Sequence, residues 1–272
     1  MNSKIAFIGG GNMASAIIGG LLRQGLSAQD ILVVEPFAPT RERLARDFGL
    51  QPLEQADASL AGAGLLVWAV KPQTFREAAA AVRPHAPDAL HLSVAAGIGS
   101  DSIAAWTGTE RVVRCMPNTP ALVGQGMTGL FARPAVTAAD RARVEQVLSP
   151  TGQLLWVDAE SHLDAVTALS GSGPAYVFYF IEAMAAAGSQ MGLSPAQALK
   201  LAVGTFVGAS ELARASDEPP EVLRERVTSK GGTTYAALCS MEESQIKAHF
   251  MQAMEKARLR AQELGREFGA DA

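Results

Sequence analysis

The segment KIAFIGGGNMA, Lys4–Ala14, decides the fold. It starts with a β-rich apolar run, turns at three glycines and continues into an apolar pattern from Met13 to Leu22 that is typical of a helix. Within it, Gly9-x-Gly11-x-x-Ala14 matches the dinucleotide-binding pattern. The first glycine permits a tight turn, the second lets a pyrophosphate approach the backbone, and the helix start attracts the anion. The alternative is a glycine turn without a ligand, which the placement after a first strand disfavours. The cofactor contacts predicted here are Ile8, Gly9, Gly11, Asn12, Met13 and Ala14.

Along the rest of the first half of the chain, further apolar runs alternate with helical stretches. The additional predicted strands are Ile31–Glu35, Leu65–Val70, Leu90–Ala95 and Val112–Met116, and two of the helices between them are Thr40–Asp47 and Thr74–Val82. The runs do not alternate with polar residues, as expected for strands covered on both faces. This order predicts an α/β Rossmann domain with a doubly wound, mostly parallel sheet.

Strand patterns stop after Asp158. Pro174, Pro195 and Pro220 each precede a helical pattern, and a charged amphipathic helix is expected from Gln245 to the C-terminus. We therefore expect a dinucleotide-binding domain over residues 1–160 and an all-α domain over residues 161–272.

Composition excludes several classes of protein. The formal net charge of -4 offers no basic surface for nucleic acid or an anionic membrane. The apolar segment Ala175–Ala187 is too short to span a bilayer and favours a core or a subunit interface.

The two cysteines, Cys115 and Cys239, form no CxxC pair, so no disulfide framework or metal cluster is expected and a reducing, cytoplasmic location fits. The strand pattern at Lys4 leaves no room for a signal or transit peptide.

Other strand ends complete the expected cofactor site, because ligands of open α/β sheets lie outside the carboxyl ends of the strands. Glu35 ends the second strand, where an acid accepts hydrogen bonds from the adenosine ribose and favours NADH. Arg41 and Arg43 follow and could neutralise the 2′-phosphate of NADPH, or lie on a solvated helix face. The remaining predicted cofactor residues are Ala69, Val70, Lys71, Pro72, Ala95, Ala96, Gly97 and Asn118.

Three further segments combine prolines, glycines and hydroxyl residues: RCMPNTP (Arg114–Pro120), ALSGSGPAY (Ala168–Tyr176) and RVTSKGGTT (Arg226–Thr234). The last is a Gly-Gly turn that opens a helix over Tyr235–Met241. Free N–H groups at such a helix start bind a carboxylate well. Thr233 could equally be a plain N-cap.

Together with WAVKPQ (Trp68–Gln73) and SVAAG (Ser93–Gly97), these segments make the chain resemble the pyrroline-5-carboxylate reductase family over nearly its whole length. The resemblance implies a Rossmann domain followed by a helical dimerisation domain. It also implies reduction of the cyclic imine 1-pyrroline-5-carboxylate to L-proline with NADPH or NADH, in homodimers that often assemble further into decamers.

The resemblance also implies residue roles. Thr234 and Ser229 would be the catalytic residues: the Thr234 hydroxyl would hydrogen-bond the ring nitrogen, with Ser229 nearby. Lys71 would lie beside the nicotinamide, or it could be an ordinary solvated lysine at a strand end. The substrate contacts it implies are Gly231, Gly232, Thr233 and Glu160. Two positions depart from the family pattern: Lys230 stands where the family usually has proline, and Glu35 stands where a serine or asparagine suited to NADPH is common.

Two other classes of protein share part of this sequence pattern. Another Rossmann reductase with a helical second domain shares the domain plan, but a hydroxyacid dehydrogenase of that type should carry a catalytic lysine on the first interdomain helix. This chain has Ser170–Gly173 there and no lysine. A catalytically silent dinucleotide-binding protein could lose the GGTT turn, which this chain keeps.

Overall fold

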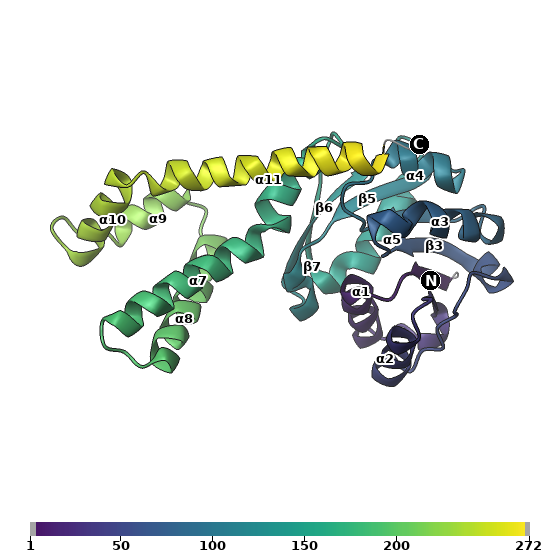
Figure 1. Ribbon diagram of the computed structural model, residues 1–272, viewed down its shortest axis with the longest axis horizontal. Coiled ribbons are helices and arrows are strands. Elements are labelled where there is room, and N and C mark those ends of the chain that lie inside the picture. The colour runs from purple at the N-terminus through teal and green to yellow at the C-terminus, as the bar shows by residue number, and fades with distance from the viewer. Residues whose placement is uncertain (1–3, 270–272) are drawn as a thin grey trace. The chain divides into compact units, whose positions relative to one another are not determined.

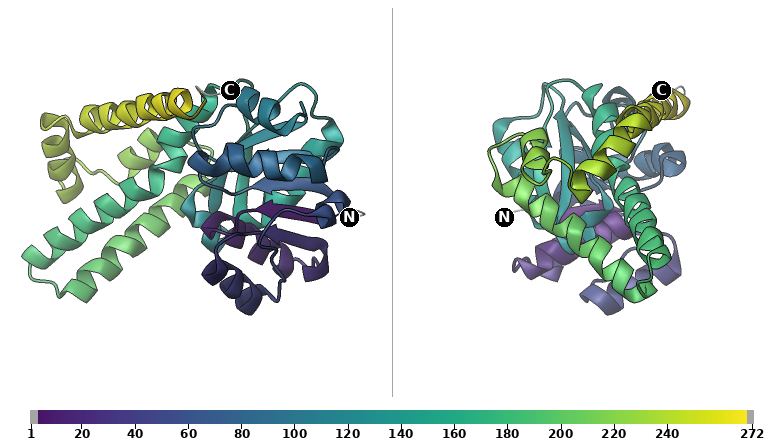
Figure 2. Two further views of the ribbon diagram at one scale, coloured as in Figure 1. Left: turned by 45° about the vertical axis from the view of Figure 1, so that its right-hand side comes forward. Right: turned by 90° about the vertical axis from the view of Figure 1, so that its left-hand side faces the viewer.

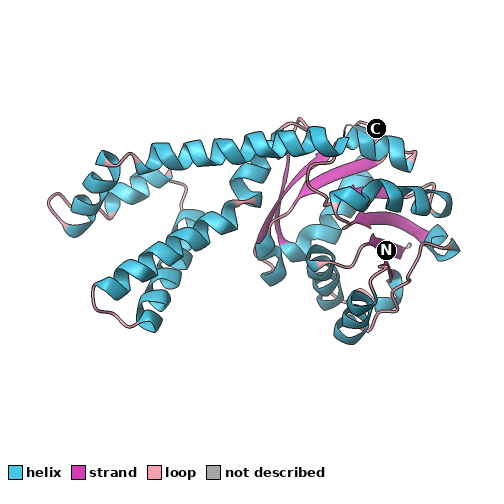
Figure 3. Ribbon diagram, viewed as in Figure 1, coloured by secondary structure: helices cyan, strands magenta, loops and turns pink. Residues whose placement is uncertain are grey.

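A computed structural model describes residues 4–269 and divides into two compact units. The first consists of the chain up to residue 172 together with the segment from residue 257 onward, and the second consists of residues 173–256. All strands of the described chain belong to the first unit, and the second is helical (Figure 3). Residues 161–172 and the end of the last helix, which the sequence analysis assigned to the helical domain, are thus grouped with the sheet.

A seven-stranded sheet in the order β2-β1-β3-β4-β5-β6-β7 forms the centre of the first unit (Figure 1). The first five strands in chain order pair in parallel, β6 runs antiparallel to β5, and β7 is parallel to β6. The strands are β1 Lys4–Ile8, β2 Ile31–Val34, β3 Ala63–Trp68, β4 Leu90–Ser93, β5 Val112–Met116, β6 Gly126–Ala132 and β7 Gly152–Trp156. The predicted doubly wound, mostly parallel sheet is confirmed, whereas β6 and β7 were not predicted.

Helices cover both faces of this sheet (Figures 1 and 2). One face packs against α1 Asn12–Arg23, α2 Ala38–Phe48 and α5 Ala138–Leu148, and the other against α3 Pro72–Val82 and α4 Ser100–Thr107. Because successive side chains of a strand point to opposite faces, the neighbours Phe7 and Ile8 of β1 lie in different core clusters. Short 3-10 turns connect the elements: η1 Ala28–Asp30, η2 Ala58–Gly62, η3 Arg83–His85, η4 Thr119–Val123 and η5 Ser149–Thr151.

The chain leaves the sheet through α6 His162–Val166 and a π-helical turn, η6 Thr167–Gly171. This segment packs on the sheet where β6 has a glycine, since a Cβ on Gly129 would lie 2.7 Å from Cγ1 of Val166. The second unit then contains α7 Gly173–Gln190, α8 Pro195–Ala215, α9 Pro220–Arg226, α10 Thr233–Glu243 and the first part of α11 Ile246–Gly269. The predicted terminal helix is confirmed as far as Gly269, and its last three residues lie outside the described part of the chain.

A buried histidine is part of the core around α3. His91 of β4 is 2% exposed, and its Nδ1 accepts a hydrogen bond of 3.0 Å from Nε1 of Trp68. Burial, and then the positive charge of Arg111, lowers the pKa of His91 to about 4. The imidazole is therefore neutral at neutral pH, as the accepted hydrogen bond requires.

Acid should destabilise the protein through this histidine. In the unfolded chain His91 binds a proton below its ordinary pKa of about 6.5, whereas the folded chain resists protonation down to about pH 4. The unfolded state then holds more protons, so the free energy of unfolding should fall by about 3 kcal/mol as the pH drops from about 6.5 to about 4. Denaturant melts over this range should show a shallower pH dependence for His91→Gln. An equal slope in both proteins would contradict this assignment.

Candidate active site

The strand order creates a crevice at the carboxyl end of the sheet. Since β2 lies on one side of β1 and β3 on the other, the connection from β1 to β2 and the connection from β3 to β4 run in opposite directions, and the neighbouring strands β1 and β3 form a switch point. Ligands of open α/β sheets bind at such a switch point. Pairing continues one residue past the strands here: Gly9 N–H donates to Val34 O and Ala69 N–H donates to Ile8 O, each at 2.8 Å.

Two glycines of the turn after β1 serve different purposes. Gly9 has a φ of +95°, and a Cβ there would lie 2.5 Å from the carbonyl oxygen of Ala69, so the fold itself requires glycine. Gly11 has a φ of -68°, and a Cβ there would meet no atom within 4 Å. Its missing side chain leaves open space beside the backbone, which suits the approach of a pyrophosphate.

The start of α1 is available to an anion. Gly11 is the N-cap of this 12-residue helix and supplies no side chain to its first N–H groups. The first turn contains no acidic residue that would oppose a negative ligand. The N–H groups of Asn12, Met13 and Ala14 and the helix dipole are thus directed toward the crevice.

The carboxylate of Glu35, which directly follows β2, is hydrogen-bonded to the glycine turn. Its Oε2 accepts a 2.8 Å hydrogen bond from Gly10 N–H, and its Oε1 accepts one of 2.9 Å from Phe37 N–H. Arg43 holds the same turn by donating to Gly10 O at 2.7 Å, whereas Arg41 donates to the carbonyl oxygens of Glu35 and of Pro36. The carboxylate therefore has a fixed position beside the glycine turn and keeps further lone pairs for a ribose hydroxyl.

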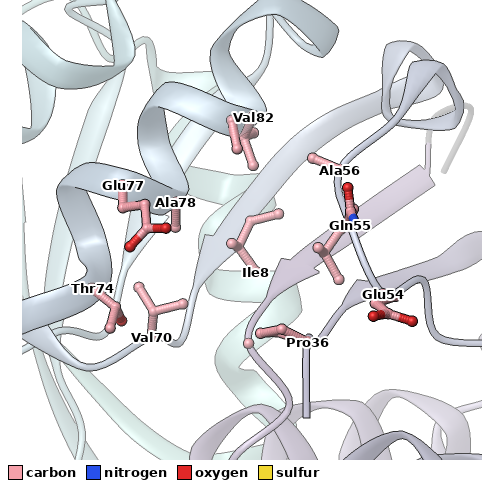
Figure 4. Close-up of a pocket in the computed structure, with 13 residues that line it drawn as sticks. Ile8, Pro36, Glu54, Gln55, Ala56, Val70, Thr74, Glu77, Ala78 and Val82 are labelled. Carbon is pink, nitrogen blue, oxygen red and sulfur yellow. The ribbon is translucent and has the colours of Figure 1, made fainter. Parts of the chain in front are cut away.

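A cavity of about 450 Å³ opens beside this turn (Figure 4). Its apolar walls include Ile8, Val70 and Val82, and Gln55 and Glu77 contribute polar groups. An apolar slot with a few polar groups, next to Glu35 at the β2 end of the crevice, suits the adenosine half of a dinucleotide. The complete lining is Ile8, Gly9, Val34, Pro36, Glu54, Gln55, Ala56, Val70, Thr74, Glu77, Ala78, Ala81 and Val82.

Lys71, Gly97 and Asn118 follow β3, β4 and β5 at the same edge of the sheet. Lys71 is exposed and directly precedes α3. The amide of Asn118 is engaged within the protein, because Oδ1 accepts from Met127 N–H at 2.9 Å and Nδ2 donates to Ser170 O at 3.0 Å. Asn118 therefore connects the segment that follows β5 to β6 and to the π-helical turn.

Glu160 lies in an ionic cluster of the first unit. Its Oε1 accepts 2.6 Å hydrogen bonds from Ser100 N–H and from Nη1 of Arg114, and its Oε2 accepts one of 2.5 Å from the Ser100 hydroxyl. The carboxylate thus stabilises the positive end of α4. Near it, burial raises the pKa of Asp164, although Arg114 and Arg258 act in the opposite direction.

Apart from Glu160, the residues predicted to bind substrate form one turn of the second unit. Gly231 has a φ of +74°, Gly232 is the N-cap of α10, and no side chain caps the helix. A Cβ on Gly232 would lie 2.7 Å from Ser229 Oγ, so the serine hydroxyl lies directly against the turn. Thr233 and Thr234 begin the helix and are exposed. The arrangement offers N–H groups and hydroxyls to a small anion.

Hence the predicted cofactor residues share one edge of the sheet, and the predicted substrate residues from Ser229 to Thr234 share one helix start. Sequence reasoning missed the hydrogen bonds of Arg43 to the glycine turn and of Ser100 to Glu160. The residue pairs involved are 33 and 60 positions apart, and no local pattern marks them.

Each half of the chain matches a known protein family. Residues 160–264 match a family model described as pyrroline-5-carboxylate reductase dimerisation, and residues 4–97 match one described as NADP oxidoreductase, coenzyme F420-dependent. A pyrroline-5-carboxylate reductase of Pseudomonas aeruginosa is 44% identical over 268 residues, which cover 98% of each chain.

Solved structures give the same result. A pyrroline-5-carboxylate reductase from Coxiella burnetii superposes with a TM-score of 0.91 at 34% identity, covering 97% of this chain and 99% of that one. A pyrroline carboxylate reductase from Plasmodium falciparum with NADP bound gives a TM-score of 0.86 at 29% identity, covering 97% and 98%.

Proposed function

The chain belongs to the pyrroline-5-carboxylate reductase family, and from this premise we propose that it reduces 1-pyrroline-5-carboxylate to L-proline with a reduced nicotinamide cofactor. The observation that carries the proposal is the end-to-end match, which includes the sheet and the GGTT helix start. The rival function, another Rossmann reductase with a helical second domain, would not require similarity at this level over the whole chain.

The residues at the carboxyl edge of the sheet fit a dinucleotide. Gly11 leaves space for a pyrophosphate, the start of α1 faces it, and the cavity beside Glu35 suits adenosine. When bound, reduced nicotinamide supplies the hydride for the imine carbon. At this edge, Lys71, Ala95 and Asn118, which follow β3, β4 and β5, are the residues that would hold the nicotinamide half.

The helix start at Gly231–Thr234 fits the substrate. We propose that the N–H groups of Gly231, Gly232 and Thr233 bind the carboxylate, and that the Thr234 hydroxyl hydrogen-bonds the ring nitrogen. A hydroxyl can accept as well as donate, so it can follow that nitrogen through its change from imine to amine. Ser229, whose hydroxyl lies against the same turn, is the second proposed catalytic residue, and Glu160 is the remaining proposed substrate residue.

The direct test of the proposed function is the oxidation of NADPH or NADH, followed by absorbance, with 1-pyrroline-5-carboxylate and the purified protein. We expect turnover that depends on both compounds and yields one proline for each cofactor oxidised. An inactive protein that binds the cofactor would instead support the silent dinucleotide-binding protein. Activity confined to other carbonyl or imine substrates would support the rival reductase.

Glu35 should influence the choice between the two cofactors. Its carboxylate is held 2.8 Å from Gly10 N, next to the expected ribose, and a 2′-phosphate would meet its negative charge. We expect both cofactors to support turnover and Glu35→Ser to raise the efficiency with NADPH relative to NADH by about tenfold. Steady-state kinetics of both proteins with both cofactors measure this ratio, and an unchanged ratio would remove Glu35 from the account.

We also propose a homodimer or larger assembly such as a decamer, located in the cytoplasm. Helix α7 has no buried residue in the single chain, although its sequence is strongly apolar. Two of its aromatic side chains are largely exposed, Phe178 at 64% and Tyr179 at 69%. An apolar hollow lined by Phe178, Ile181 and Leu199 continues this surface. Such a patch needs a protein partner, and this part of the chain matches a dimerisation domain.

Among the described residues, no helix is long and apolar enough to cross a membrane.

Light scattering should therefore give a mass at least twice the 28.4 kDa of one chain. Phe178→Glu should lower it toward one chain by placing a charge in the apolar surface. Gln146→Glu adds the same charge on α5 of the first unit and should leave the mass unchanged. A single-chain mass for the active wild-type protein would contradict the proposed assembly.

A further inference from the structure

The loop Ala95–Gly99 joins β4 to α4 and lies one strand beyond the switch point. If the adenosine half of a dinucleotide lies beside Glu35 and its pyrophosphate lies over the start of α1, the nicotinamide half extends toward β3 and β4. The conformation of this loop then decides how the reacting ring is held. This step rests on the function proposed above.

The end of α11 packs directly on this loop. Gly97 has a φ of +74°, and a Cβ there would lie 3.1 Å from Cδ2 of Phe268 and 3.2 Å from Cβ of Leu264. Phe268 is partly buried and packs against the core cluster that includes Ala95 and Ile98. Gly97 was predicted as a cofactor residue, and its surroundings show that it also makes room for a helix.

The loop itself contributes Ile98, which is fully buried in this core cluster, and a few hydrogen bonds hold its two ends. At its start, Ala95 N–H donates to Ser93 Oγ at 3.2 Å, and just beyond its end Ser100 N–H donates to Glu160. Between these points, Gly97 and Gly99 border a cavity of about 300 Å³ that is also lined by α11. The apolar contact of Leu264 and Phe268 is therefore the support that reaches Gly97 from outside the loop, and a small change of side chain on α11 can remove it.

We propose that Phe268, with Leu264, is a positioning residue for the nicotinamide half of the cofactor. It lies 34 residues beyond Thr234 and would act only through the Ala95–Gly97 backbone, without touching the reacting atoms. A loop that loses this support samples conformations in which the nicotinamide ring is bound less well, whereas the adenosine half of the site, beside β1 and β2, keeps its geometry.

Two ligands separate this role from a general loss of structure. NADPH occupies both halves of the site, whereas 2′-phospho-ADP-ribose lacks the nicotinamide. Calorimetry without substrate should show that Phe268→Ala weakens NADPH binding about tenfold and leaves binding of 2′-phospho-ADP-ribose within a factor of about two. Phe268→Leu, which keeps an apolar side chain, should restore most of the NADPH affinity.

Glu267→Ala is the matched control, because Glu267 is half exposed on the same turn and pairs with Arg260 on the helix surface. It should bind both ligands as the wild type does. Unchanged NADPH binding in Phe268→Ala, or equal weakening of both ligands, would overturn the proposal. Because no substrate is added, this result is independent of the turnover assay: NADPH binding without reductase activity would refute the proposed function alone.

Discussion

Replacing Thr234 with valine should lower kcat about a hundredfold and leave the affinity for NADPH unchanged. Valine keeps the branched shape and removes only the hydroxyl that we assign to the ring nitrogen. Loss of one positioned polar contact in a transition state typically costs about this much in rate. Cofactor binding should persist because its proposed residues lie in the sheet unit, whereas Thr234 lies at the start of α10.

Thr233→Val is the matched control for this change. It removes the same hydroxyl one residue earlier, where the account uses only the backbone N–H group, so its kcat should stay near the wild-type value. In a competing account, Thr234 merely stabilises the first turn of α10, which predicts a lower melting temperature with nearly normal kcat. Kinetics and a melting curve on both variants separate the two accounts, and a near-normal kcat for Thr234→Val would mean that another group bonds the nitrogen.

The two glycines after β1 should respond in opposite ways to the same added methyl group. Gly11→Ala should fold as stably as the wild type, because its Cβ meets no atom within 4 Å and its φ suits alanine. It should nonetheless bind NADPH about a hundredfold more weakly, since the methyl group fills the space proposed for the pyrophosphate.

Gly9→Ala should instead destabilise the fold by about 3 kcal/mol or more. Its φ of +95° disfavours any side chain, and the new Cβ would lie 2.5 Å from the carbonyl oxygen of Ala69. Urea melts and NADPH titrations of both variants test the pair. Normal NADPH affinity in a stable Gly11→Ala protein would show that the dinucleotide lies elsewhere.

Local patterns predicted the first five strands and the helices α1 and α3 because each buries several apolar residues in a continuous or periodic arrangement. Helices α2 and α11 were predicted from charged helical patterns, and each has one buried residue, Leu44 and Ala261. Strand β6 escaped prediction for a reason that is visible only in three dimensions. Its sequence contains two glycines, and one of them, Gly129, is needed because Val166 packs against it from 37 residues further along the chain. The strand also runs antiparallel to β5, which breaks the β-α-β order that had guided the assignment.

The site shows the same division between local and distant information. The glycine turn, Glu35 and the GGTT helix start could be recognised from residue types and spacing. The partners of Glu35, Asn118 and Glu160 could not, because their hydrogen bonds join positions 25, 52 and 60 residues apart. Gly97 was recognised as important, but the contact that requires it comes from the end of the last helix.

The most direct test of the central claim is to follow the fate of the transferred hydrogen. The protein is supplied with 1-pyrroline-5-carboxylate and NADPH that carries deuterium at its transferable position, and the product is examined by mass spectrometry and NMR. We expect L-proline with a single deuterium on the δ carbon, the former imine carbon. Unlabelled proline, a label at another carbon, or no proline despite bound NADPH would contradict it.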